Sequence, residues 1–516
     1  MVSTEALKGT DVPRPVAPGD LPEEELRWCT VTLQEVLARD SRLEASVFDV
    51  EGKHAREVLK RCKWPVVRVC GESGLADAYH RPRFKRIWIE KSNFPIYQPS
   101  QITELNPKPS GYLSPLTQTD IDALRVHKGQ ILLTCSGTVG NVALVGNTLN
   151  NRIFSHDVIR ITAKNDTDTG YLYAFLRTRT GQALIRTNEY GAVVSHIEPQ
   201  HLENVPVPDP PPFLKKRIHE LVIRSYDLRD ESNDLLDQAE ALLYDALKLP
   251  PIEKLKPRYF DSSVDLRSYT VKLSQLEGRL DASYHAPIVD AILRRLKKEA
   301  VEITTIGDPR ISKRIILPGR FARVYVQEGQ GTIFFGGKQI YELDPSNKKY
   351  LSLTHHKKRI KKELKLEENM VMITCSGTIG KVALVPKHWE GWTANQHVIR
   401  VVPAFDEIAG YLYVFLASDY GRELITRFTY GAVVDEIDDR HVAQIAVPLL
   451  KDQKVQSEIN RLALEANAKR TKAYYAEQDA IRITNREVIH THSSGIRDGG
   501  DIKPRFVIPV HSKNRS

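Results

Sequence analysis

Hydrophobic and small residues between positions 214 and 249 recur at alternating steps of four and three. This heptad spacing is typical of a helix that packs one narrow apolar stripe against another helix. Prolines at 210–212 and at 250–251 are expected to bound the helix. At a rise of about 1.5 Å per residue it would be about 54 Å long. The stripe includes Leu214, Ile218, Leu221, Leu228, Leu235 and Leu242.

A second segment near the end of the chain has the same spacing and offers a partner for the first. It extends from Val455 to Ile483, includes Ile459 and Leu462, and has Lys469 as its one polar interruption. We therefore expect two long antiparallel coiled-coil helices that pair along their stripes. The sequence preceding each helix would then form a domain at one end of the rod.

The sequence before the first helix is repeated before the second, at an offset of about 240 residues. A period this long is not that of a solenoid and indicates a duplicated globular unit followed by a helix. Short β-rich runs and one helical pattern within each copy predict an α+β fold class with two homologous mixed α/β domains. The clearest matching pairs are 134–145 with 374–385, 170–176 with 410–416, and 190–194 with 430–434.

These patterns divide the chain into six predicted parts. Two globular domains alternate with two helical spacers, and a flexible arm and a flexible tail complete the chain. The predicted boundaries are 1–26 for the arm, 27–212 for the first domain, 213–268 for the central helix, 269–450 for the second domain, 451–490 for the C-terminal helix and 491–516 for the tail.

Composition narrows the class of protein and of partner. Of 516 residues, 41% are hydrophobic and 27% charged, and no apolar run approaches the roughly 20 residues of a membrane span. The five cysteines are sparse, and no apolar signal core is evident near the start, so we expect a cytoplasmic protein. The net charge of +9 favours a polyanionic partner, nucleic acid first.

Basic residues cluster at corresponding places in the two copies and are candidates for phosphate contact. A solvated surface is an equally good interpretation of each cluster. The candidates are Arg81, Arg83, Lys85 and Arg86 in the first copy, and Arg314, Arg320 and Arg323 in the second.

The repeated Ser-Gly-Thr turn is the most specific motif. Its hydroxyls are those of Ser136, Thr138, Ser376 and Thr378, beside glycines whose backbone N–H groups could point outward to a phosphate or a base. A purely structural turn with left-handed glycines is the favoured alternative.

A second repeated turn begins at Tyr190 and Tyr430, which either contact nucleic acid or support the core. Asn141 and Lys381 share one repeat position, as do His156 and Gln396. If the copies read DNA, positions that differ between them would read different bases. Neutral drift is the competing explanation.

No sequence motif points to an enzyme. The Pro-rich segment 209–213 has some likeness to the Asp-Pro-Pro-Tyr loop of amino-methyltransferases, but no Gly-rich loop for S-adenosylmethionine accompanies it. His490 and His492 are better explained as solvated than as metal ligands. We therefore expect no catalytic residue and no bound metal, while a stand-alone DNA methyltransferase or nuclease, or a non-specific coiled-coil scaffold, stay as alternatives.

Taken together, the duplicated motifs and the heptad helices resemble the specificity (S) subunit of type I restriction-modification systems. The resemblance covers roughly residues 30–490 and lies in the turn at 129–140, the segment 153–161, Tyr190 with Gly191, and a Val-Pro exit into the helix. In the second copy Asn395 and Gln396 follow the family habit more closely than Ser155 and His156.

The resemblance implies two target recognition domains, each reading one half of a bipartite, asymmetric site in double-stranded DNA. The helices would fix the distance between the half-sites and dock modification (methyltransferase) subunits, two copies in the family's arrangement. S-adenosylmethionine would be bound by the modification subunit, and a restriction subunit would complete the complex. This chain itself would be non-catalytic and would bind no cofactor and no membrane.

Overall fold

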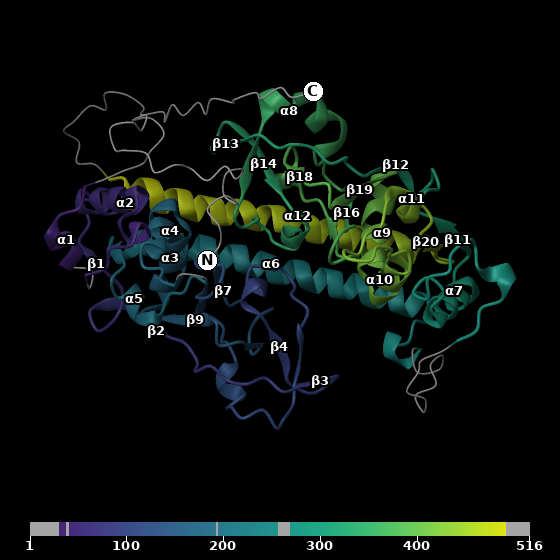
Figure 1. Ribbon diagram of the computed structural model, residues 1–516, viewed down its shortest axis with the longest axis horizontal. Helices are drawn as coiled ribbons and strands as arrows, with labels where there is room; N and C mark the ends of the chain where they lie inside the picture. The colour runs from purple at the N-terminus through teal and green to yellow at the C-terminus, as the bar shows by residue number, and fades with distance from the viewer. Residues whose placement is uncertain (1–29, 38–40, 192–193, 256–268, 492–516) are drawn as a thin grey trace, which may run out of the picture.

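Two long helices lie side by side along the longest axis of the molecule (Figure 1). The computed structural model describes residues 30–37, 41–191, 194–255 and 269–491. Helix α6 spans Pro212–Ala246 and α12 spans Gln453–Ile483. They are antiparallel, because Ser225 near the start of α6 donates to the Ala473 carbonyl (2.8 Å) while Glu231, further along, pairs with Lys469 (2.7 Å). Lys469, the polar interruption predicted in the second helix, therefore has its charge neutralised by Glu231 of the first.

The buried surface of α6 is wider than the predicted stripe. Leu214, Ile218 and Leu228 are buried as expected, but Val222 and Leu243, which lie outside the heptad positions, are buried too. The extra burial arises because α6 packs on both the partner helix and the globular halves. A stripe that serves two neighbours must be wider than a coiled-coil seam.

Each globular half contains one large and one small sheet. In the first half the large sheet has the order β10-β1-β2-β9-β6-β7 and the small sheet β3-β5-β4-β8. The elements are α1 Leu33–Leu37, α2 Val50–Lys60, β1 Val66–Cys70, β2 Gly74–Tyr79, β3 Trp88–Ile89, β4 Pro95–Tyr97, β5 Gly111–Leu113, β6 Ile131–Thr134, β7 Val142–Leu144, β8 Ile153–Phe154, β9 Val158–Ala163, α3 Asp166–Arg177, α4 Arg179–Arg186, α5 Pro199–Leu202 and β10 Pro206–Pro208.

The second half repeats this order. Its large sheet is divided into β11-β20 and β12-β19-β16-β17, and its small sheet is β13-β15-β14-β18. The elements are α7 Pro287–Glu299, β11 Glu302–Thr305, β12 Ser312–Ile316, β13 Tyr325–Val326, β14 Gly331–Phe335, β15 Lys349–Ser352, α8 Leu353–Arg359, β16 Val371–Thr374, β17 Val382–Leu384, β18 Thr393–Ala394, β19 Val398–Pro403, α9 Asp406–Ala417, α10 Asp419–Thr426, α11 Asp439–Ala443 and β20 Ala446–Leu449. Segments that match poorly in sequence, 47–80 and 285–320, therefore also carry corresponding elements.

The same two contacts attach each half to its own long helix. Gly170 in α3 and Gly410 in α9 approach α6 and α12 so closely that an added Cβ would lie 2.6 Å from His219 Cα and 2.5 Å from the Asn460 carbonyl oxygen. The next residue in each helix is a buried tyrosine, whose hydroxyl donates to the carbonyl of Pro208 or Pro448. The repeated Gly-Tyr pair is therefore a packing motif, in which glycine is required by space.

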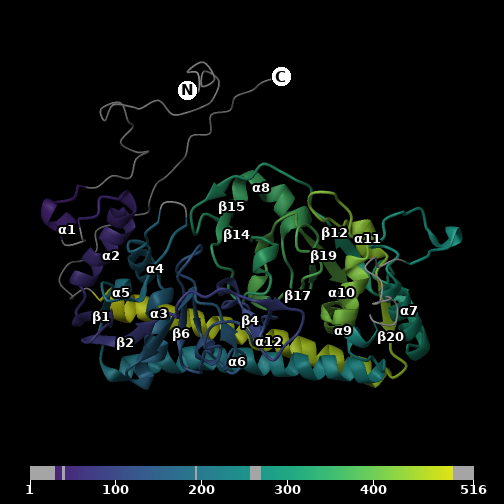
Figure 2. The same cartoon turned by 60° about the horizontal axis from the view of Figure 1, so that its bottom comes forward.

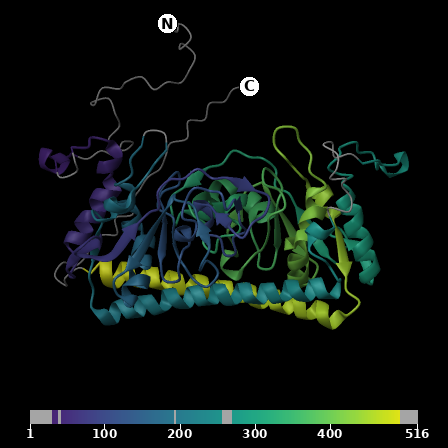
Figure 3. The ribbon, with the colours of Figure 1, turned by 90° about the horizontal axis from the view of Figure 1, so that it is seen from below.

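Half a turn about the viewing direction of Figure 1 approximately exchanges the two halves, since β3 and β4 lie on one side of the helices and β13 and β14 on the other. Both halves rise from the same face of the helix pair (Figures 2 and 3). They touch where Glu104 pairs with Glu342 in an antiparallel bridge, and the Leu105 amide donates to the Tyr341 carbonyl at 2.9 Å. Glu104 and Glu342 occupy the same repeat position, so this junction lies on the approximate axis.

Several boundaries differ from expectation. The central helix ends at Ala246, so the predicted spacer 213–268 is helical over its first part, and its residues 256–268 lie outside the described chain. The predicted arm 1–26 and tail residues 492–516 lie outside it as well. Thr491, assigned to the tail, is buried and accepts a hydrogen bond from the Lys63 amide. No helix in the described part of the chain is long and apolar enough to cross a membrane.

Candidate nucleic-acid interface

The Ser-Gly-Thr turns join β6 to β7 and β16 to β17, and both have the same internal geometry. The Thr134 hydroxyl donates to the Thr138 carbonyl (2.6 Å) and accepts from the Asn141 amide (3.0 Å). Thr374 does the same in the second copy, with the same two distances. Gly137 and Gly377 have positive φ values of 73° and 76°, which explains why glycine stands between the hydroxyl residues.

The outward-pointing amides that the sequence suggested are not all free. The Gly137 amide donates to the Ser195 carbonyl (3.0 Å) and the Gly377 amide to the Asp435 carbonyl (2.9 Å). This part of the expectation is wrong, because each turn is held against the loop that follows the repeated tyrosine. Thr138 and Thr378 are exposed, and Ser136 and Ser376 are half-buried. The side-chain hydroxyls, not the glycine amides, are therefore available to a ligand.

The cysteine in each turn is structural. Cys135 and Cys375 are buried, and burial raises the pKa of each thiol to about 12. A thiol with so high a pKa is almost entirely protonated near neutral pH and is a poor nucleophile. Each cysteine's carbonyl accepts the amide of Ile197 or Ile437, which joins the turn to the loop after the tyrosine.

The repeated tyrosines lie at the surface beside these turns. Tyr190 is 36% exposed and Tyr430 is 42% exposed, so neither is a core residue. The Tyr190 hydroxyl donates to Glu198 (2.6 Å), and this hydrogen bond is the main cause that raises the pKa of Tyr190 to about 12. Both rings also contact a histidine, His201 or His441, with ring centres 5.4 Å apart. The rings are held in place and partly open to solvent.

The variable position of the repeat lies in the segment next to each turn. His156 is 15% exposed in its side chain, pairs with Asp157 (3.2 Å) and has its pKa lowered chiefly by burial. Gln396 instead accepts a hydrogen bond from Arg323 (2.7 Å) through its amide oxygen. The segment joins the turn because the Cys135 and Cys375 amides donate to the carbonyls of Asp157 and His397.

The basic segments flank this same place in both halves. Arg86 lies 3.7 Å from Asp157, and Arg83 and Lys85 are exposed nearby in the chain. In the second half Arg320, whose side chain is 81% exposed, lies 3.5 Å from Glu436, next to the Tyr430 turn. Each half thus gathers arginine, hydroxyl and aromatic side chains around one turn.

Two of the basic residues that the sequence suggested for phosphate contact do not lie beside the Ser-Gly-Thr turns. Arg81 is half-buried, with its guanidinium 5.0 Å from the centre of the Tyr79 ring. Arg314 is exposed on β12, where it lines a hollow with Asp439 and Arg440.

Asn141 and Lys381 do not join this group. Lys381 lies at the junction of the halves, 3.8 Å from Glu104 and with its ammonium 4.9 Å from the centre of the Tyr341 ring. Asn141 has the corresponding position in the first half and is half-buried. Lys381 connects the halves, so its difference from Asn141 needs no explanation in terms of base reading.

Sequence reasoning missed two features of the site. Arg160 and Arg400 are completely buried beneath it, where they donate to backbone carbonyls such as those of Val158 and Val398, and burial lowers their pKa values to about 10. The repeated Val-Ile-Arg at 158–160 and 398–400 was the available signal.

The second missed feature is apolar and exposed. Val194, Val433 and Val434 lie in the loops after the repeated tyrosines, and Val433 is 97% exposed. The valines are repeated in a short turn that has neither helical nor strand spacing. This pattern could have predicted from the sequence that they are exposed. Apolar loop residues of this kind suit contact with a thymine methyl group. Among the described residues, no group of three or more His, Cys, Asp or Glu side chains could hold a metal ion.

Comparisons with known proteins find one family model that matches part of the chain. Residues 79–227 match the family model of the type I restriction modification DNA specificity domain. Among solved structures, the chain is similar to the S subunit of a type I restriction-modification system from M. genitalium, at 13% identity, with 84% of this chain and 97% of that chain covered and a TM-score of 0.29.

It is also similar to the HsdS subunit from Thermoanaerobacter tengcongensis, at 14% identity, with 83% and 96% covered and a TM-score of 0.25. No curated protein matches the chain.

Proposed function

We propose that this chain is the DNA-reading subunit of a type I restriction-modification complex, because residues 79–227 match the type I restriction modification DNA specificity domain. Each half reads one half of a bipartite, asymmetric site in double-stranded DNA. The observation that supports this most directly is the duplicated surface of Ser136, Thr138 and Tyr190 in one half and Ser376, Thr378 and Tyr430 in the other, each flanked by arginines.

The long helices set the distance between the two half-sites. Lys469 and Glu231 pair across the helices at 2.7 Å, and Arg217 pairs with Glu487 at 3.1 Å near one end, so the two helices hold a fixed register. A rod of fixed register places two DNA-reading surfaces a fixed number of base pairs apart. The antiparallel coiled coil is thus a spacer between two target recognition domains.

The remaining subunits supply the chemistry. The exposed faces of α6 and α12 dock modification subunits, two copies in the simplest arrangement because the halves are related by an approximate two-fold axis. S-adenosylmethionine binds to those subunits, a restriction subunit completes the complex in the cytoplasm, and this chain takes no part in bond making or breaking.

A domain exchange tests the division of labour. The full chain, co-expressed with its modification subunit, is first used to select its recognition sequence from random DNA. Residues 27–212 are then replaced by the corresponding domain of another specificity subunit, and the selection is repeated. One half of the site should change and the other should persist. A change in both halves, or in neither, contradicts the proposal, as does methyl transfer by this chain without a modification subunit.

A pair of charge variants tests which surface faces DNA. Arg320→Gln with Arg323→Gln should weaken binding about 10-fold or more, and should make the salt dependence shallower by about 0.9 for each phosphate that is no longer neutralised. The matched control is Lys297→Gln with Lys298→Gln, which removes the same charge from exposed positions on α7, outside the proposed docking faces of α6 and α12. Equal weakening in both pairs would mean that net charge, not this surface, governs binding.

A further inference from the structure

The junction between the halves has two sides. Because the halves are repeats of one another, the two sides are built from corresponding positions of the repeat. Arg229 and Arg470 occupy one repeat position in the long helices, and each lines a different hollow beside the junction. Beside them, three other repeat positions differ: Arg177 corresponds to Ala417, Glu477 to Leu236, and Asp344 to Asn106. We call the Arg229 side the closed side and the Arg470 side the open side.

Charged side chains fill the closed side. Glu477 is 1% exposed and lies 2.8 Å from Arg229 and 3.6 Å from Arg177. Arg177 also pairs with Asp344 at 3.2 Å, and Tyr173 donates to Glu477. The space left there is about 10 Å³. Two arginines and two carboxylates balance one another, which is what makes their burial tolerable.

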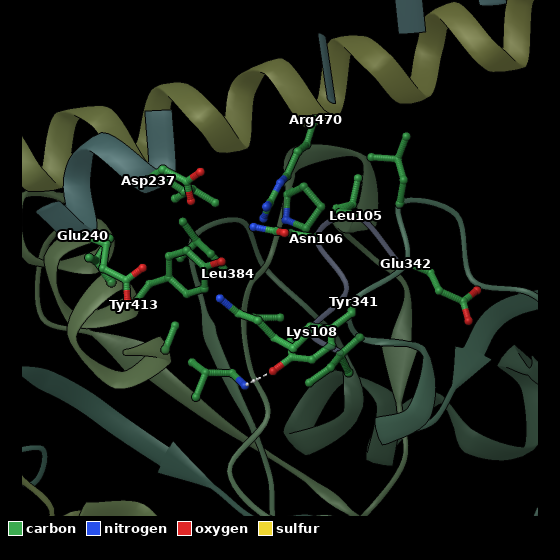
Figure 4. Close-up of a pocket in the computed structure, with 18 of the residues that line it drawn as sticks. Leu105, Asn106, Lys108, Asp237, Glu240, Tyr341, Glu342, Leu384, Tyr413 and Arg470 are labelled. Atoms are coloured by element: carbon green, nitrogen blue, oxygen red, sulfur yellow. Dashed lines mark hydrogen bonds between the residues drawn. The ribbon is translucent and has the colours of Figure 1, made fainter. Parts of the chain in front are cut away.

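The open side lacks three of these charged side chains and is hollow. Ala417 and Leu236 replace the Arg177 and Glu477 side chains, and a cavity of about 140 Å³ remains between α6, α9, α12 and the second half's sheet (Figure 4). A dry cavity of about 150 Å³ is large enough to hold a benzene molecule. Leu384, Trp389 and the ring of Tyr413 give the cavity an apolar wall.

Arg470 lines this cavity without the carboxylate that its counterpart has. It is 8% exposed, its Nε donates to the Ser232 hydroxyl at 3.4 Å, and the end of its guanidinium points toward Asn106 in the cavity (Figure 4). Among the described residues, no carboxylate lies within ion-pair distance of Arg470. A buried guanidinium with donors left over is costly unless an anion completes it.

Three carboxylates line the cavity. In Figure 4, Asp237 and Glu240 lie on one side of Arg470 and Glu342 lies on the other, with Lys108 between them. Glu342 accepts a hydrogen bond from the Ser346 amide at 2.6 Å. Burial is the main cause that raises the pKa of Glu240, and Lys108 is the cation that opposes this rise.

We propose that the open side is a binding site for a small organic carboxylate. The ligand's carboxylate pairs in a bidentate manner with Arg470 and accepts from the Asn106 amide, in the place that Glu477 takes on the closed side. Its apolar body lies against Leu384, Trp389 and Tyr413. Because both halves line the cavity, the bound ligand contacts both. The proposal does not rest on DNA reading.

The first test uses benzoate with the full chain, titrated by calorimetry, and benzamide as the neutral isostere. Benzoate should bind saturably at one site, and benzamide about 10- to 100-fold more weakly because it lacks the charge that pairs with Arg470. Arg470→Met should weaken benzoate by a similar factor, whereas Lys472→Met, on an exposed position of the same helix, should not. No saturable binding, or equal binding of the two ligands, would overturn the proposal.

The second test exchanges the two sides. Leu236→Glu, Ala417→Arg and Asn106→Asp together rebuild the closed side's charges in the cavity and should abolish benzoate binding while circular dichroism stays native. Arg177→Ala, Glu477→Leu and Asp344→Asn together open the closed side and should raise the stoichiometry from one benzoate to two. If the first variant keeps wild-type affinity, the cavity is not the site, and the proposal is wrong whatever the DNA-binding result.

Discussion

The closed and open sides of the junction have the same backbone elements and the same central arginine, but opposite interiors. On the closed side, burial alone would raise the pKa of Glu477, yet Arg229 and Arg177 outweigh it and hold that pKa below its ordinary value. On the open side, an alanine and a leucine leave a cavity beside Arg470. Differences at three repeat positions distinguish a packed ionic cluster from a hollow, because each half supplies only part of each side.

The largest effect is expected from Glu477→Leu. The variant leaves Arg229 and Arg177 buried without their carboxylate, and breaking a buried pair costs about 3–5 kcal/mol. Because the pKa of Glu477 is lowered by folding, its contribution is present above its ordinary pKa and is lost as pH falls through the lowered value. Urea unfolding should show that the variant loses this stability at neutral pH and loses less of it at acid pH.

Leu236→Met at the equivalent position is the control. An apolar exchange of similar volume should cost less than about 1.5 kcal/mol, with no pH dependence. A Glu477→Leu deficit no larger than this would show that the closed side's ion pairs contribute little to stability.

A smaller effect is expected from the link that joins the halves. Lys381 pairs with Glu104 at 3.8 Å, and the two side chains are 26% and 13% exposed. Burial raises the pKa of Glu104 and Lys381 opposes it, so Lys381→Ala should cost about 1 kcal/mol in urea unfolding. Asn141→Ala, at the same position of the other half, has no charged partner to lose and should cost less. A larger loss of stability for Asn141→Ala than for Lys381→Ala would contradict the asymmetry of the junction.

The smallest effect concerns the exposed tyrosines. Tyr190→Phe removes the hydrogen bond to Glu198 and should cost about 0.5 kcal/mol near neutral pH. The bond lowers the pKa of Glu198 from 4.5, so its contribution is present above pH 4.5 and disappears as pH falls through the lowered value. It also raises the pKa of Tyr190 to about 12, so the contribution is present below pH 10 and is lost as pH rises through about 12.

Tyr430→Phe is the comparison in the second half. Asp438 replaces Glu198 there and accepts from the His441 amide at 2.9 Å. The substitution should therefore have a smaller effect on unfolding. Equal costs for both tyrosines would mean that the ring, not the hydroxyl bond, accounts for the stability.

Local motifs predicted the fold better than the site. The heptad spacing located both long helices to within a few residues, because helix-forming apolar positions and flanking prolines act over one or two turns. The turns at Ser136 and Ser376 were located for the same reason. The orientation of their amides was not, because the loop that covers them lies some 60 residues further along the chain.

Positions that differ between the copies show most clearly what the sequence could not predict about the site. Gln396 and His156 are half-buried beside the turns, whereas Lys381 lies at the junction, and nothing in the local sequence separates the two cases. Which residues face DNA therefore stays a prediction, and the charge variants of Arg320 and Arg323 are its test.

The sequence by itself determined the mixed α/β class and the two long helices, since these depend on patterns that span a few turns or strands. Only the tertiary structure decided which face each turn presents, that the halves touch at Glu104 and Glu342, and that one side of this junction is filled while the other is hollow. The physical reason is that Arg177, Asp344 and Glu477 are far apart along the chain, and their charges act on one another only after the chain has folded around them.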